Sequence, residues 1–433
     1  MIGNRRSRSA VFAALLAALT STTALGAQQE ATVTLDEAVE LALRVQPTVV
    51  QARGDVRVAQ ASRREAVGNW LPTISGNSSW SRNSATRIDP TTQRTITAPA
   101  RDFYSAGLNA SLTLFDGFRR SAQGRSAGAN AASADAQLVS ARFQVSLQTK
   151  QTFFNALAAA ELVGVSETRI RRAEEQLKIA RDKLAAGSAT RSDTLRSTVE
   201  LGSARLQLLE AKTQLATTEA GLARLIGFDG AVRAVADSSL FTVTPIDTSG
   251  LRDELLRTSP VILAADAAVA AAGAQVAVTR AQFFPTVTAS YRSDWSGTGV
   301  DQLSNSWSAR VSLSWSLFNG FTRESNVARV GAQRDAAEAR LEDERRLAMA
   351  QLTQDLAAIQ SAQARMQIAE ASLVAAEEDL RVQRERYRLG AATILEVLTT
   401  QVSLDQAAVD LVQSRLDFLV ARAQLEALLG REL

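Results

Sequence analysis

The sequence contains no cysteine and no histidine among its 433 residues. Without cysteine the chain cannot form disulfides, thiolate metal sites or a lipidated cysteine. Without histidine it lacks the commonest general base and the commonest zinc ligand, and a Ser-His-Asp triad is impossible. The sequence also has no nucleophile–base arrangement and no phosphate-binding loop. We therefore expect no enzymatic activity, no metal and no cofactor.

The small excess of positive charge lies at the N-terminus. The chain has 48 Lys and Arg against 45 Asp and Glu, a net charge of +3. Arg5, Arg6 and Arg8 precede a short apolar run and the small residues Ala24–Ala27, a pattern typical of a secretory signal peptide over residues 1–27. A buried helix or membrane anchor is the alternative interpretation. Removing this segment leaves 45 basic and 45 acidic residues, so nothing favours nucleic-acid binding.

The sequence has no second continuous apolar run of 18 residues, so we expect no transmembrane helix after the signal peptide. An exported chain can still enter a membrane as strands of a closed β-barrel. That possibility remains open at this point. The many Asp and Glu residues scattered along the chain are interpreted as solvated helix faces.

Short motifs occur twice in the same order. Leu71-Pro72-Thr73 matches Phe284-Pro285-Thr286, and Leu114–Phe118 matches Leu317–Phe321. We infer two repeats, at 28–230 and 251–433, joined by a linker at 231–250. The expected elements of the first repeat are a helix at 35–69, a β-hairpin at 73–115, a long helix at 120–186 and a helix at 191–226. Those of the second are a helix at 251–282, a β-hairpin at 286–318, a long helix at 324–389 and a helix at 394–429.

The long helices carry apolar residues at every seventh position. This spacing predicts coiled-coil seams and left-handed supercoiling. At about 1.5 Å per residue, a helix of 67 residues spans roughly 100 Å. Such a rod has no thick core, so we expect copies of the chain to associate. The seam residues in the second long helix are Leu352, Ile359, Met366, Leu373, Leu380 and Tyr387.

The segments between the first and long helices alternate strictly between apolar and polar residues. Ser306–Phe318 is the clearest example, and its length is that of a tilted membrane strand. Four such strands cannot close a barrel alone, and open edges are forbidden in lipid, so several protomers would share one barrel; three would give twelve strands. A soluble β-sandwich is the alternative. The expected membrane-interface aromatics are Trp80, Tyr291, Trp295, Trp307 and Trp315.

In the order of its repeats and in its Leu-Phe-Asp/Asn-Gly-Phe and Gly-x-x-Thr-x-x-Asp/Glu motifs, the sequence resembles the TolC-type outer-membrane channel family. The resemblance implies a mainly α fold with a small β part. It implies a homotrimer whose twelve-stranded barrel lies in outer-membrane lipid and whose helical tunnel lies in the periplasm. It also implies a periplasmic adaptor protein and an inner-membrane pump as partners.

The resemblance further implies a gate at the turns between the long and last helices. Glu396 falls where the family places a ring of carboxylates, and Asp193 and Tyr387 match positions that tie neighbouring helices in the closed state. Ala392 stands where some members carry an arginine, and Thr399 where some carry a second acid. The turns would also contact the adaptor; their residues are Gly187, Ser188, Ala189 and Thr190 in the first repeat, and Gly390, Ala391, Ala392 and Thr393 in the second.

Two functions remain open from the sequence. The first is an outer-membrane exit duct of a tripartite efflux pump or a type I secretion system. The second is a periplasmic coiled-coil structural or adhesion protein whose strands never enter lipid. A duct needs no chemistry of its own, which agrees with the absence of histidine and cysteine.

Overall fold

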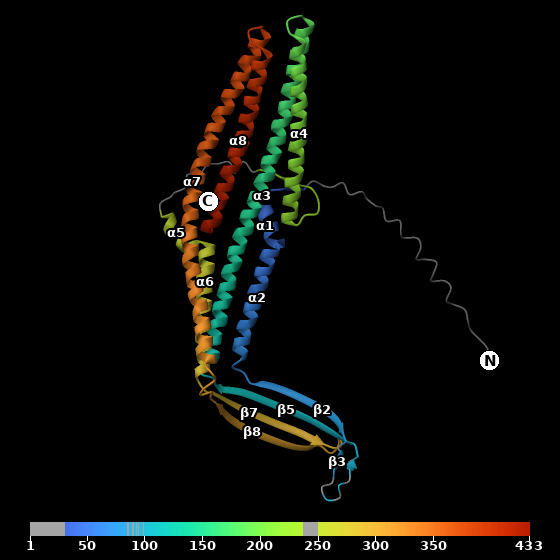
Figure 1. The fold of residues 1–433 in the computed structure, drawn as a ribbon, viewed down its shortest axis with the longest axis vertical. Coiled ribbons are helices and arrows are strands. Elements are labelled where there is room, and N and C mark those ends of the chain that lie inside the picture. The colour runs from blue at the N-terminus through green and yellow to red at the C-terminus, as the bar shows by residue number, and fades with distance from the viewer. Residues whose placement is uncertain are drawn as a thin grey trace, which may run out of the picture.

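The computed structural model of the chain describes residues 31–236 and 250–433, apart from residues 85, 89, 90, 92, 94 and 98. The expected signal peptide and most of the expected linker lie outside the described residues. The described part is elongated, with helices along most of its length and a small sheet at one end (Figure 1). The mainly helical fold class with a small β part is confirmed.

The two halves of the described chain have the same order of long elements. In the first half these are α1 (Leu35–Val45), α2 (Pro47–Gly68), β2 (Thr73–Asn83), β5 (Arg101–Phe115), α3 (Arg119–Ala185) and α4 (Arg191–Ile226). In the second they are α5 (Leu251–Thr258), α6 (Pro260–Arg280), β7 (Thr286–Gly297), β8 (Ser304–Ser314), α7 (Thr322–Arg388) and α8 (Ile394–Leu429). The short elements are β1 (Ala31–Val33), β3 (Thr86–Ile88), β4 (Thr95–Thr97), β6 (Val232–Ala234) and a 3-10 turn (Ala281–Phe283).

The expectation of one continuous helix at the start of each repeat is wrong. Each is interrupted once, before Pro47 and before Pro260. A proline disfavours helical backbone in the preceding residue, and its ring cannot donate a main-chain hydrogen bond. Accordingly Gln46 and Ser259 have extended ψ angles of 126° and 120°. Each proline then starts a new helix at its first position, where the missing donor is tolerated.

The four long strands form one antiparallel sheet in the order β2-β5-β7-β8. Each half contributes a hairpin, and β5 and β7 join the two hairpins side by side, with a bulge at Leu114. Successive side chains alternate between the two faces. One face is apolar and exposed, since Trp307, Val311 and Leu313 are each 68–69% exposed. β2 and β8 are the unpaired edges of this sheet.

Each long helix packs against the helix that follows it, α3 against α4 and α7 against α8 (Figure 1). The main core lies midway along the rod, where α1, α5 and the ends of α4 and α8 meet the long helices; Phe153, Leu222, Leu255 and Leu425 are fully buried there. The seven-residue seam continues from this core along α7, where Leu352, Ile359, Met366, Leu380 and Tyr387 are buried. In the first pair the seam is less complete, since Leu184 is 38% exposed.

Helix α6 departs from the expectation that no later segment could span a membrane. By length and composition alone, the 24 residues Pro260–Phe283 could do so. Most of these residues are alanine or valine, and the charged ones are Asp266 and Arg280. In the structure α6 lies between α3 and α7 in a single layer of helices. Its alanines therefore serve close packing within this layer, because small side chains let helices approach one another.

Asp355 on α7 is a buried carboxyl group with incomplete hydrogen bonding. It is 2% exposed; its Oδ1 accepts from Gln351 Nε2 at 2.7 Å, and its Oδ2 has no partner among the described residues. Burial raises the pKa of Asp355. A raised folded-state pKa gives stability that is present below the unfolded value of 3.8 and is lost as the pH rises through the raised pKa.

We therefore expect Asp355→Asn to raise the unfolding free energy at pH 7 by about 1 kcal/mol, since it removes a poorly solvated charge. It should also flatten the fall in stability between acidic and neutral pH. Guanidinium unfolding followed by circular dichroism at several pH values measures both effects. Asp343→Asn, at an exposed position of the same helix, is the control. A variant that is less stable than the wild type at pH 7 would contradict the prediction.

Candidate functional site

The end of the molecule far from the sheet consists of two helical hairpins, α3–α4 and α7–α8 (Figure 1). Both turns have the same geometry. Gly187 and Gly390 have φ angles of 72° and 80°, which a side chain would disfavour. In the first turn Ser188 N donates to Lys183 O at 2.9 Å, and in the second Ala391 N donates to Arg386 O at 2.7 Å. These are Schellman motifs, which satisfy the last carbonyls of each long helix.

A threonine and a carboxylate start the next helix in both hairpins. Thr190 N donates to Asp193 Oδ2 at 3.0 Å, and Asp193 N donates to Thr190 Oγ1 at 3.3 Å. Thr393 and Glu396 form the same pair of bonds, at 3.0 and 3.3 Å. These capping boxes place a negative charge at the positive end of each helix. Both predicted gate carboxylates are held within their own turns; Glu396 is exposed, and Asp193 is half-buried.

Tyr387, on the last turn of α7, is buried and lies between the hairpins. It packs with Leu380, Ile394 and Val397, and Ile179 of α3 packs against the same cluster. Its hydroxyl has no hydrogen-bond partner among the described residues. Burial, and then the negative charge of Asp193, raise the pKa of Tyr387. The structure thus brings Tyr387 and Asp193 into electrostatic contact, whereas Glu396 bonds only within its own turn in the described chain.

Lys183 is a residue of this site that the sequence interpretation missed. Its Nζ lies 4.6 Å from the ring centroid of Tyr387 and donates to the carbonyl oxygens of Tyr387 and, at 3.2 Å, Arg388. The last turn of α3 is thereby tied to the last turn of α7, where the helix dipole favours a cation. The equivalent residue of the second repeat, Arg386, instead donates to Ala391 O of its own turn at 3.3 Å. The first repeat thus has a lysine where the second has an arginine, and this difference in the sequence could have drawn attention to Lys183.

A charged cluster joins the hairpins further from the turns. Arg169 Nε lies 3.0 Å from Asp405 Oδ2, Arg169 Nη2 lies 2.7 Å from Glu200 Oε1, and Arg172 binds Asp405 Oδ1. Asp405 is 7% exposed, so its interpretation as part of a solvated helix face is wrong. Burial raises the pKa of Asp405, although Arg172 and Arg169 favour its ionised form. The cluster connects α3 and α4 to α8, and it contains two positive and two negative side chains.

The predicted interface aromatics lie on or beside the apolar face of the sheet. Tyr291 and Trp307 stack with their ring centroids 6.3 Å apart. Trp315, just after β8, donates from Nε1 to Phe283 O at 3.2 Å. Trp80, Trp307 and Trp315 are each more than half exposed. Exposed aromatics on an apolar strand surface are typical of a protein that faces lipid.

Known proteins resemble this chain over most of its length. The sequence profile of the outer membrane efflux protein family matches residues 38–228 and 251–431. The pyoverdine export outer membrane protein OpmQ of Pseudomonas aeruginosa is 30% identical over 409 residues, which cover 92% of this chain and 85% of OpmQ. The cation efflux system protein CusC of Escherichia coli is 25% identical over 369 residues, covering 82% of this chain and 76% of CusC.

Solved channel structures share the fold. A crystal structure of CusC superposes with a TM-score of 0.81 at 21% identity, covering 92% of both chains. The Campylobacter jejuni outer-membrane channel CmeC superposes with a TM-score of 0.78 at 19% identity, covering 92% of this chain and 85% of CmeC. The family profile and the curated relatives support the efflux duct over the coiled-coil structural or adhesion protein, and they place the sheet in the outer membrane and the helices in the periplasm. The chain therefore belongs to the outer membrane efflux protein family.

Proposed function

We propose that the two hairpin turns form the closed periplasmic entrance of a trimeric efflux channel. The observation that carries this proposal is the tie from Lys183 to the last turn of α7, which holds the two hairpins together at their ends. Tyr387 is buried in the same contact. Opening the entrance would separate the hairpins, expose Tyr387 to water and remove the cation from the end of α7.

In a trimer, three copies of Glu396 would surround the entrance. Each carboxylate is exposed and close to the tip, so a ring of them would favour cations and repel one another when ionised. Asp193 has the matching place on the first hairpin, where its charge acts on Tyr387. In this proposal Glu396 sets the selectivity of the entrance, while Asp193, Lys183 and Tyr387 set the separation of the hairpins.

The turns are also the proposed contact with a periplasmic adaptor, which would link the channel to an inner-membrane pump. The tips carry exposed apolar side chains beside the residues of the two turns. Leu389 is 83% exposed, and Leu195 and Leu395 are 57% and 58% exposed. Exposed apolar side chains at the water-surrounded end of a helical rod indicate a protein contact. Energy for export would come from the pump, since the duct only provides a path.

The gate assignment is tested by ion conductance. We expect Glu396→Ala combined with Tyr387→Phe to raise the conductance of the purified channel in planar bilayers and to reduce its preference for cations. Glu377→Ala, which removes an exposed carboxylate of α7, is the control. Unchanged conductance and selectivity in the double variant would count against the gate.

The cargo class is tested in cells. The relatives OpmQ and CusC are named for pyoverdine export and cation efflux, which favours small molecules over proteins as cargo. A strain that lacks this chain should become more sensitive to small toxic compounds, with an unchanged pattern of secreted proteins. Loss of a secreted protein without any change in sensitivity would instead indicate type I secretion.

A further inference from the structure

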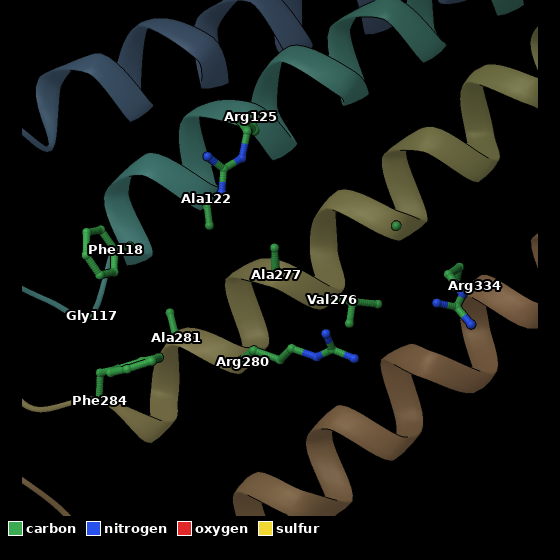
Figure 2. Close-up of a pocket in the computed structure, with 11 residues that line it drawn as sticks. Gly117, Phe118, Ala122, Arg125, Val276, Ala277, Arg280, Ala281, Phe284 and Arg334 are labelled. Carbon is green, nitrogen blue, oxygen red and sulfur yellow. The ribbon is translucent and has the colours of Figure 1, made fainter.

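A cavity of about 370 Å³ lies between α3, α6 and α7 at the end of the helices nearest the sheet (Figure 2). Ala277 and Phe284 give it an apolar wall, and Gly117 lies at its end next to the sheet. Three arginines from three different helices surround it, Arg125 on α3, Arg280 on α6 and Arg334 on α7. None of the residues that carry the proposed gate lies here, so the cavity needs its own explanation.

The positive charge of the cavity is only partly compensated. Arg334 forms ion pairs with Asp335 at 2.7 Å and Glu338 at 3.2 Å. Arg125 donates to Ser121 Oγ at 3.3 Å and has no carboxylate partner, and Arg280 has no hydrogen-bond or ion-pair partner among the described residues. Guanidinium groups are well suited to bind phosphate oxygens in pairs of hydrogen bonds. Arg125 and Arg280 are therefore available for an anionic ligand.

The cluster is not a by-product of the duplicated fold. The positions equivalent to Arg125, Arg280 and Arg334 in the other repeat hold Ala328, Val67 and Ala131. By contrast, the structural arginines at the starts of α3 and α7 occur in both repeats. Arg120 and Arg323 are both buried, and each donates to a carbonyl at or just after the end of a strand and lies over an aromatic ring. The cavity arginines thus occur once per chain, where the two repeats meet.

The two figures view opposite faces of the helical layer. With the sheet at the lower end, Figure 1 shows α7, α6, α3 and α2 from left to right. In Figure 2, turned so that the ends of the helices nearest the sheet point down, α3 lies to the left of α6 and α7 to its right. Figure 2 looks onto the face on which the side chains that line the cavity lie. The cavity therefore opens on the face that is turned away from the viewer of Figure 1.

Figure 1 shows the polar face of the sheet. There β7 runs to the right, with β8 below it. The Ser296 carbonyl points to β8, since it accepts from Ser304 Oγ at 3.0 Å. When a strand of L-residues runs to the right and the carbonyl of a residue points down, the side chain of that residue points toward the viewer. The side of β7 that carries Ser296 therefore faces the viewer, and the same side carries Thr286, Thr288 and Ser290. The cavity consequently opens on the side of the apolar face, which is the side of the lipid.

We propose that this cavity binds the phosphate of an anionic phospholipid in the periplasmic leaflet of the outer membrane. It lies next to the strand ends, at the level where the helices leave the membrane. Arg125 and Arg280 bind the phosphate oxygens, and Ala277 and Phe284 contact the carbon atoms of the lipid. One lipid per chain would join α3, α6 and α7, and so attach the tunnel to the bilayer.

The proposal is tested by lipid binding to the purified, delipidated full-length channel in detergent. Native mass spectrometry measures phosphatidylglycerol retained by the wild type and by the variant R125Q/R280Q. We expect about tenfold or greater weakening of the apparent Kd in the variant, because two charge-assisted contacts are lost. Arg280→Gln alone, at an exposed position, should give an intermediate loss. Arg340→Gln, an exposed arginine of α7 outside the cavity, should bind as the wild type does.

A second arm uses inorganic phosphate as a soluble probe, with unfolding by circular dichroism as the readout. We expect phosphatidylglycerol, but not phosphate at the same concentration, to raise the melting temperature of the wild type. Stabilisation by phosphate alone would assign the site to a soluble anion and overturn the lipid assignment. Equal retention of phosphatidylglycerol by R125Q/R280Q and the wild type, with both correctly assembled, would overturn the site itself.

Discussion

Replacing Asp405 by alanine should lower the unfolding free energy by about 3–5 kcal/mol, the range found when one partner of a buried ion pair is removed. Asp405 holds Arg169 and Arg172 together between the two hairpins and is almost fully buried. Without it, two guanidinium groups would share the single carboxylate of Glu200. The shift in the guanidinium unfolding midpoint, followed by circular dichroism, measures the effect.

Charge balance provides the control for this prediction. The double variant Asp405→Met with Arg172→Met leaves the pair Arg169–Glu200, which is balanced at 2.7 Å. It should therefore be more stable than Asp405→Ala. Asp410→Ala, at an exposed position of the same helix, should change the midpoint little. If Asp405→Ala unfolds at the wild-type midpoint, the cluster does not hold the hairpins together.

Replacing Lys183 by glutamine should raise the single-channel conductance several-fold, the largest functional effect that we expect from one substitution. Glutamine is too short and uncharged, so it loses the two carbonyl contacts on α7 and the contact with the Tyr387 ring. The hairpins would then separate more often at their tips. Planar-bilayer recordings of the purified channel measure the change directly.

The matched control is Lys178→Gln, which removes an exposed lysine of the same helix. Its conductance should equal that of the wild type. Because Lys183 is only half-buried and lies at the end of the rod, far from the main core, the unfolding midpoint of Lys183→Gln should stay close to that of the wild type. If the single-channel conductance of Lys183→Gln equals that of the wild type, the contact of Lys183 with α7 plays no part in gating.

The patterns that repeat along the sequence predicted the fold well. Heptad spacing indicated the seam from Leu352 to Tyr387, and alternation indicated the strand around Trp307, because both reflect regular backbone geometry. The helix breaks at Pro47 and Pro260 were missed, although they could have been predicted, since proline disfavours helical backbone in the residue just before it. The motif Gly-x-x-Thr-x-x-Asp/Glu marks both turns in the sequence, and its threonine and acid have the spacing of the capping boxes that form there.

Contacts between the hairpins could not be predicted in the same way. Arg169 and Asp405 are 236 positions apart, and nothing in the surroundings of either distinguishes it from a solvated side chain. Their meeting depends on how α3 lies along α8, which is a matter of packing between repeats. Lys183 was missed for the same reason, although its difference from Arg386 was visible. The cavity arginines likewise come together only when α3, α6 and α7 lie side by side.

The pairing of β5 with β7 has a consequence for how copies of the chain assemble. It leaves β2 as one edge and β8 as the other, and these strands run in opposite directions because the sheet has an even number of alternating strands. In the proposed trimer, the β8 edge of one copy would therefore meet the β2 edge of the next copy in antiparallel orientation, and the same would hold for any number of copies. Such head-to-tail contacts would be heterologous, and they close into a ring only if the rotation between neighbouring copies permits it. Strand curvature, set in part by the bulge at Leu114, then decides how many chains complete the circle.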